Sequence, residues 1–336
     1  MGLKPAVVSV IAGLTPATYQ PHPFHRDTEA WSETNCYVDL WIEVLHSLGL
    51  DPLALLPFSF ATDFEGDQWT FLKPSLDDLW SLYGIDVQEL NIWDRLDKHI
   101  GEQVERGNLP LVEVDAFFLP DTQGVSHRTE HTKTTIAVNA IDFTQAHLGY
   151  FHNSGYYELG GQDFRDVLRL EKPTGDDCLA PYAEFAKLNR RTAPHEGTLR
   201  RISLSIAQRH LQRRPEQNPI TKYRARFGRD MEEVLANPVS YYHKYAFATL
   251  RQMGTGFLLS ALYLRWLEEG EDMGLGDAAH SFLRISDGAK TLLFKMARAV
   301  NSKKPLPYEA IMDTMEADWQ SAHALLSARL ECCRNG

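Results

Sequence analysis

The second half of the chain has its hydrophobic positions spaced at a helical period. Apolar residues recur every three or four positions, which predicts helices. The predicted helices are residues 196–212, 222–235, 239–269, 277–300 and 307–333. The breaks between them fall at Asn237-Pro238, at Gly270 and at 303–307, where helix-ending residues cluster.

The first half has shorter apolar runs bounded by turn residues, a pattern typical of strands. The predicted strands are residues 111–118, 134–141 and 148–151, the last two forming a hairpin. One helix is clear, at residues 36–48. The pattern therefore predicts an α+β fold, with a mixed domain at residues 1–170 and an all-helical domain at 171–336.

The composition indicates a globular protein and argues against a membrane-spanning or nucleic-acid-binding one. The 336 residues are 43% hydrophobic and 24% charged, which is ordinary for globular chains and long enough for two domains. No apolar run approaches the ~18–20 residues that cross a bilayer. The net charge of -11 argues against binding nucleic acid or an anionic membrane through bulk charge.

The cysteines are sparse and form neither a disulfide framework nor a zinc motif. They are Cys36, Cys178, Cys332 and Cys333. The sequence therefore predicts a reduced, cytoplasmic protein without a metal or other cofactor.

Cys36 is the candidate nucleophile because of its place at a helix start. Asn35 suits the N-cap, and Val38, Trp41 and Leu45 supply an apolar face at helical spacing. Amide N–H groups in a first turn favour a thiolate and can hold an oxyanion, so we expect a lowered thiol pKa. The alternative is that Cys36 is a small buried hydrophobic residue.

His131 is the candidate base. It precedes the predicted strand 134–141, and His152 and Asn153 follow the return strand. This order can place an imidazole and an orienting side chain at one edge of a sheet, as thiol catalysis requires. The alternative, for most of the 13 histidines, is a solvated or structural role.

Several motifs in the chain resemble an uncharacterised bacterial family. They are Asn35-Cys36-Tyr37-Val38-Asp39-Leu40-Trp41, Gly66-Asp67-Gln68-Trp69-Thr70-Phe71, Val112-Glu113-Val114-Asp115-Ala116-Phe117-Phe118-Leu119-Pro120 and His131-Thr132-Lys133. That family is similar to the N-terminal domain of butirosin biosynthesis protein H, an acyltransferase of papain-like fold. The close resemblance covers nearly the whole chain, and the remote one covers residues 30–170.

The resemblance implies a papain-like domain that takes an acyl or aminoacyl group from the phosphopantetheine thiol of a carrier protein. By position, Cys36 is the nucleophile, His131 the base and Asn153 the orienting residue. Asp142 and Glu158 are alternatives for the third role.

The resemblance also concerns the oxyanion site, where Asn35 and Gln68 are the predicted oxyanion or substrate-binding residues. Papain-like peptidases often carry a glutamine shortly before the cysteine, and residues 26–35 contain none. This departure puts peptidase chemistry in doubt more than thioester chemistry, because thioesters are already activated.

A basic segment, residues 187–229, interrupts the acidic chain. It carries a net charge of +10, which leaves -21 for the remaining residues. We expect it to bind an acidic carrier protein through Arg190, Arg191, Arg200 and Arg201. Alternatively, it pairs internally with acids of the N-terminal half, such as Asp63 and Asp97. RNA is a lesser option, because no motif of a known RNA-binding module is present.

The sequence leaves three functions open. The first is acyl or aminoacyl transfer from a carrier thioester through a Cys36 acyl-enzyme. The second is amide or peptide hydrolysis by the same thiol. The third is a non-catalytic module that binds an acidic partner.

Overall fold

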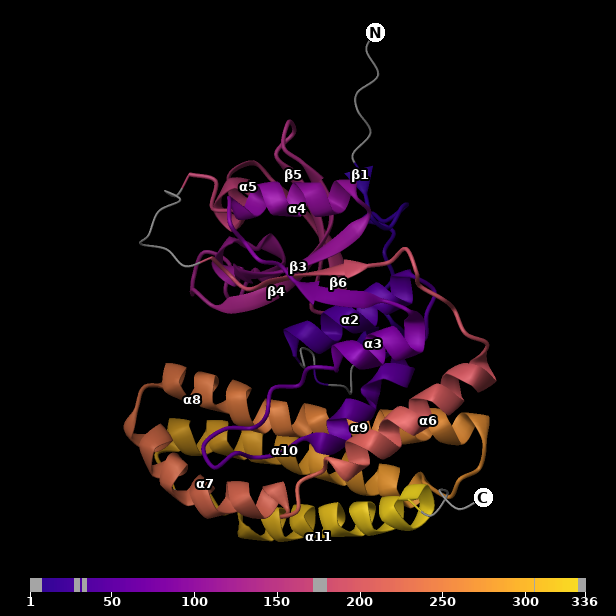
Figure 1. The fold of residues 1–336 in the computed structure, drawn as a ribbon. Helices are drawn as coiled ribbons and strands as arrows, with labels where there is room; N and C mark the ends of the chain where they lie inside the picture. The colour runs from indigo at the N-terminus through magenta and orange to yellow at the C-terminus, as the bar shows by residue number, and fades with distance from the viewer. Residues whose placement is uncertain (1–7, 27–30, 32–34, 172–179, 305, 332–336) are drawn as a thin grey trace. The chain divides into compact units, whose positions relative to one another are not determined.

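The computed structural model describes residues 8–26, 31, 35–171, 180–304 and 306–331 (Figure 1). The chain divides into two compact units. Unit 1 comprises Met1–Pro52 and Leu76–Ala193, and unit 2 comprises Leu53–Ser75 and Pro194–Gly336. The predicted boundary at 170/171 lies before the last strand of unit 1, whereas the units divide at 193/194.

Unit 1 is built on an antiparallel sheet. The described residues give seven strands: β1 (Val8–Ser9), β2 (Asp86–Glu89), β3 (Asn108–Asp115), β4 (Lys133–Asp142), β5 (His147–His152), β6 (Gly155–Gly160) and β7 (Ala183–Lys187). Their order is β2-β7-β3-β4-β5-β6, and β1 pairs with β4. The helices described in unit 1 are α1 (Pro23–Arg26), α2 (Cys36–Ser47), α3 (Leu76–Tyr83), α4 (Leu96–Glu105) and α5 (Gly161–Val167). Short 3₁₀ turns follow β3 at Ala116–Phe118 and Pro120–Thr122.

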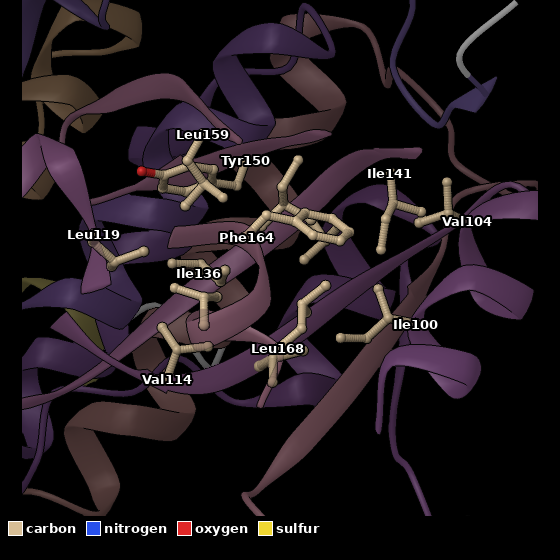
Figure 2. Packing of buried hydrophobic residues seen from close by; sticks show 14 of the residues in the cluster. Ile100, Val104, Val114, Leu119, Ile136, Ile141, Tyr150, Leu159, Phe164 and Leu168 are labelled. Carbon is tan, nitrogen blue, oxygen red and sulfur yellow. The ribbon is translucent and has the colours of Figure 1, made fainter. Parts of the chain in front are cut away.

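The sheet buries both faces. Alternate residues such as Ile136 of β4 and Tyr150 of β5 meet Ile100 of α4 and Phe164 of α5 in one apolar cluster (Figure 2). Figure 1 shows α4 and α5 on one side of the sheet and α2 and α3 on the other. Helix α2 packs against β4 and β5, and its Trp41 is fully buried. This packing holds the start of α2 against the sheet.

Unit 2 is helical. Its helices are α6 (Glu196–Gln212), α7 (Pro219–Ala236), α8 (Val239–Ala246), α9 (Gln252–Gly270), α10 (Gly276–Ser302) and α11 (Glu309–Leu326). A π-helical turn, Phe247–Arg251, joins α8 to α9, so the predicted helix 239–269 is one helical run with a bulge. A second π turn, Ser327–Glu331, follows α11.

Residues 53–75 belong to the core of this helical unit. The 3₁₀ segment Pro52–Ala61 places Phe60 beside Tyr263, with ring centroids 5.6 Å apart. The following turn places Trp69 against Tyr223, at 5.6 Å. Residues 53–75 lie in the first half of the sequence. Their aromatic side chains nevertheless pack with the helices of the second half, in unit 2.

The structure confirms a mixed α+β protein with a helical C-terminal region. In the described part of the chain, no helix is both long enough and apolar enough to span a membrane.

Candidate active site

Cys36 is the first residue of α2 and is half-buried. Asn35 is its N-cap, as the sequence predicted. The Asn35 side-chain oxygen accepts hydrogen bonds from the N–H groups of Tyr37 (3.0 Å) and Val38 (3.2 Å). The cap therefore uses two of the first-turn amides that were expected to stabilise a thiolate, and the N–H of Cys36 lies outside these bonds.

The environment of the Cys36 thiol raises its pKa, opposite to the expected direction. Burial is the largest cause, and the charge of Asp39 acts in the same direction. Hydrogen bonds from the Thr134 hydroxyl and from the N–H and hydroxyl of Thr135 oppose it. The resting group is therefore a thiol that needs a base when it reacts.

The geometry of β4 explains why Thr135 can donate its N–H. The N–H of Ala116 donates to the carbonyl of Thr132, which fixes the alternation of the antiparallel β3–β4 pair. By that alternation, the N–H of Thr135 points away from β3. The pairing of β4 with β5 extends only to Ala137 at this end, so the amide is available to Cys36.

The histidine connected to Cys36 is His152, at the end of β5. Its Nε2 lies 2.7 Å from the Thr134 hydroxyl, and its Nδ1 lies 2.5 Å from Asp121 Oδ2. The hydroxyl of Tyr150 donates to the other oxygen of Asp121 at 2.5 Å. The side chains of His152 and Asp121 are only 2% and 5% exposed, so this pair is shielded from water.

Asp121, His152 and Thr134 form a continuous hydrogen-bonded chain, and the Thr134 hydroxyl also acts on the Cys36 thiol. Because Asp121 accepts from Nδ1–H, a neutral ring offers Nε2 as an acceptor to the Thr134 hydroxyl. The threonine oxygen can then accept from the Cys36 S–H. When the thiol loses its proton, both bonds reverse, and every group keeps a partner. The chain can therefore carry a proton between sulfur and imidazole.

His131, the predicted base, has other contacts. Its Nδ1 lies 2.6 Å from Asp115 Oδ2, and its ring stacks on Phe117 with centroids 4.3 Å apart. The side chain is 69% exposed. His131 thus has a carboxylate partner and an open ring face, and the proposed Cys36–His131 dyad stays a prediction.

The candidates for the third residue lie in turns or at the surface. Asn153 has φ 45° and occupies the two-residue turn between β5 and β6, a position that favours asparagine. Asp142 accepts from the N–H groups of Thr144 and Gln145 in the preceding turn. Glu158 lies 3.5 Å from His147.

The predicted oxyanion residues differ in setting. Asn35 is buried and caps α2, as described above. Gln68 is exposed and belongs to unit 2, in a turn where its carbonyl accepts from the N–H of Glu65 at 2.8 Å. A role for Gln68 in an oxyanion site stays a prediction.

The predicted carrier-binding arginines fall in both units. Arg190 and Arg191 are exposed residues of unit 1, and Arg201 is an exposed residue of α6. Arg200 instead packs over the ring of Trp266 at 4.4 Å and bonds to Glu196, with only 15% of its side chain exposed. Arg200 therefore has a structural role in the packing of unit 2.

Other cations of the basic segment have acidic partners within their own unit. Lys222 pairs with Asp63, Arg224 with Asp313 and Lys187 with Asp86. The internal pairing that the sequence left open therefore accounts for part of the segment.

Sequence reasoning placed His152 near the site but missed its link to the thiol. The signal was available as a pattern: Thr134 near the start of one hairpin strand and His152 at the end of the next are brought together by antiparallel pairing. Asp121 could not be found this way, because it lies in a 3₁₀ turn whose fold is set by tertiary packing.

Comparison with models of protein families identifies the family of the chain. A DUF1839 N-terminal domain matches residues 20–188, and a DUF1839 C-terminal domain matches residues 196–328. The chain belongs to the DUF1839 family, an uncharacterised family. No curated protein matches it. The DUF1839 match thus confirms the uncharacterised family predicted from the motifs, without a link to butirosin protein H.

Proposed function

We propose that this DUF1839 protein is a cysteine-dependent acyl or aminoacyl transferase that works through a Cys36 acyl-enzyme. The observation that carries the proposal is the buried hydrogen-bond chain from Asp121 through His152 and Thr134 to Cys36. A nucleophilic thiol requires a base that is oriented by a third group, and this chain supplies both.

In the acylation step, Cys36 Sγ forms a bond to the carbonyl carbon of the acyl donor. The thiol proton passes to Thr134, and the Thr134 proton passes to His152 Nε2. The N–H of Thr135 and that of Cys36 supply donors for the oxyanion. When the intermediate collapses, the leaving thiolate takes the proton back through the same chain, which gives acyl-Cys36 and a thiol.

In the second step, an acceptor amine attacks acyl-Cys36 and gives its proton to the Thr134 hydroxyl, whose own proton passes to His152 Nε2. The Cys36 sulfur leaves and recovers a proton through Thr134, which restores the resting thiol. Water in place of the amine gives hydrolysis, so the acceptor decides between a transferase and a hydrolase.

A thioester suits this site better than an amide. A departing thiol has a pKa of about 8.5 and leaves as a thiolate, whereas a departing amine must first be protonated. Here the imidazole reaches the reacting atoms only through a hydroxyl group. The absence of a glutamine at residues 26–35 points in the same direction.

The arrangement of α2 supports a papain-like fold for unit 1. A helix that begins at the cysteine packs against an antiparallel sheet, and the imidazole comes from the sheet. In this proposal the imidazole belongs to the second hairpin strand, and a threonine occupies the first strand opposite it.

An acidic carrier protein with a phosphopantetheine thioester is the proposed donor. The support is the exposed Arg190, Arg191 and Arg201 in an otherwise acidic chain. Carrier proteins present an acidic surface and a phosphate, which guanidinium groups bind well.

The test is intact-mass analysis after incubation with an acyl or aminoacyl N-acetylcysteamine thioester. The wild-type protein is expected to gain the mass of the acyl group, and Cys36→Ala is expected to lose that gain. His152→Gln should slow loading by at least about a hundredfold, as expected for loss of a general base. His131→Gln is the matched control, because it removes the other candidate imidazole.

Loss of loading in His131→Gln, with His152→Gln unaffected, would replace the His152 chain with the sequence-predicted dyad. An absence of any Cys36 adduct, in a folded wild-type protein offered both small and carrier thioesters, would favour the non-catalytic binding module. Circular dichroism of each variant separates a lost base from a lost fold.

A further inference from the structure

A second buried ionic cluster lies on the same helix as Cys36. Asp39 and Glu43 follow Cys36 by one and two helical turns and are 1% and 0% exposed. Two buried carboxylates one turn apart repel each other and are costly without a cation between them. The structure places the ring of His25 there, with its side chain only 4% exposed.

Both ring nitrogens of His25 face carboxylates. Nε2 lies 3.2 Å from Asp39 Oδ1, and Nδ1 hydrogen-bonds to Glu43 Oε1. A carboxylate only accepts, so both nitrogens must donate, and the ring is an imidazolium. Burial acts to lower the pKa of His25, but the hydrogen bonds and charges of Asp39 and Glu43 outweigh it and raise the pKa to about 9.

The other groups around this cluster fix its charge. Glu43 also accepts from the Tyr19 hydroxyl and from the N–H of His22. Asp39 accepts from the N–H of Asn35, the residue that precedes Cys36, at 3.2 Å. Residues 19–26 are therefore held against α2 by the carboxylates of Asp39 and Glu43.

The cluster acts on the thiol through Asp39. Among the described groups that act on Cys36 are Asp39 from its own helix and Thr134 and Thr135 from β4, with His152 hydrogen-bonded to Thr134. Of these, the charge of Asp39 opposes formation of the thiolate. The imidazolium of His25 contacts this carboxylate, with Nε2 3.2 Å from Asp39 Oδ1.

We propose that His25 is a positioning residue for Cys36: its imidazolium offsets the negative field of Asp39 at the thiol and holds the start of α2. The proposal rests on the proposed function for its biological meaning. The effect on the thiol exists whether or not the protein transfers acyl groups.

The test is the rate of Cys36 alkylation by iodoacetamide as a function of pH, followed by mass mapping of the Cys36 peptide. His25→Gln removes the cation, and the apparent pKa of Cys36 should rise. A rise of one unit slows labelling at neutral pH about tenfold. The matched control is His22→Gln on the same segment, where burial lowers the pKa of His22 to about 4 and the ring is neutral. It should leave the rate unchanged.

Asp39→Asn separates electrostatics from structure. By itself it should speed labelling, and combined with His25→Gln it should restore the rate toward wild type. A purely structural role for His25 predicts no such rescue. Equal rates in wild type and Asp39→Asn would overturn the proposal, even if His25→Gln proved unstable.

Acyl loading is measured separately from alkylation. If His25→Gln slows alkylation while the wild type loads no acyl group, the proposed function fails and the role of His25 stands. If the wild type loads and alkylation is equal in the wild type and all of these variants, only the role of His25 fails.

Discussion

At the scale of single residues, two histidines of one segment respond to their surroundings in opposite ways. His25 lies between two carboxylates, and its pKa is raised to about 9. His22 is half-buried, with His46 as an edge-on ring neighbour at 5.3 Å, and its pKa is lowered to about 4. Burial disfavours the charged form of both, and only the carboxylate contacts of His25 reverse its effect.

The pKa of His25 predicts a loss of stability in alkaline solution. Its folded pKa of about 9 exceeds the ordinary histidine pKa of 6.5, so the contribution to stability is fully present below pH 6.5 and disappears as the pH rises through 9. The contribution is on the order of 3 kcal/mol. Urea unfolding of wild type and His25→Gln should therefore show a difference in free energy that shrinks over this range. A difference that grows with pH would contradict the pairing.

His22→Gln is the control for that series. Because the folded pKa of His22 lies below 6.5, its contribution is present above pH 6.5 and is lost as the pH falls toward 4. The two variants should therefore differ from wild type at opposite ends of the pH range.

At the scale of elements, α2 brings together the features of the site. Asn35 caps it, Cys36 begins it, and Trp41 buries its apolar face. The sequence predicted this helix because its capping residue and apolar spacing are local signals. It also predicted the hairpin of β4 and β5, because alternating apolar residues flank a short turn.

The cap predicts a measurable change in stability. Asn35→Ala leaves the amides of Tyr37 and Val38 without their acceptor and should lower the free energy of unfolding by about 1 kcal/mol. Asn35→Ser keeps an acceptor oxygen and should retain most of that stability. Chemical denaturation of the three proteins measures it, and equal stability of Asn35→Ala and wild type would show that the cap contributes nothing.

What the sequence could not predict depends on contacts between distant segments. His25 meets Asp39 14 residues along the chain, and Asp121 meets His152 31 residues along it, so neither pair has a local signature. The lowered pKa expected for Cys36 was wrong because burial, the largest cause, and the charge of Asp39 on the same helix outweigh the hydrogen bonds that favour the thiolate.

At the scale of the whole molecule, the chain carries exposed basic residues within an acidic background. Many cations of the segment 187–229 pair with acids, such as Lys222 with Asp63 and Arg224 with Asp313. The sequence found the segment from composition but could not separate paired from exposed cations, because partners such as Asp63 and Asp313 are distant in the chain. Arg201 is the exposed member, within unit 2, of the four arginines that the sequence predicted to bind an acidic partner.

Docking of a carrier predicts a specific charge effect. Arg201→Glu should slow acyl loading from a carrier-protein thioester severalfold at low salt and leave loading from a small thioester unchanged. The matched control is Lys295→Glu, an equal change of charge at an exposed residue of α10. Equal slowing by both variants would show a general effect of net charge, and equal loss with both substrates would reject docking.

The proposed proton relay depends most on the hydroxyl of Thr134, which links His152 to Cys36. The most direct measurement is the rate of Cys36 acylation by a small thioester in Thr134→Val and Thr134→Ser. Valine keeps the shape and removes the hydroxyl, so loading should fall by about a hundredfold or more, whereas serine keeps the hydroxyl and should load near the wild-type rate. Wild-type loading by the valine variant would contradict the relay.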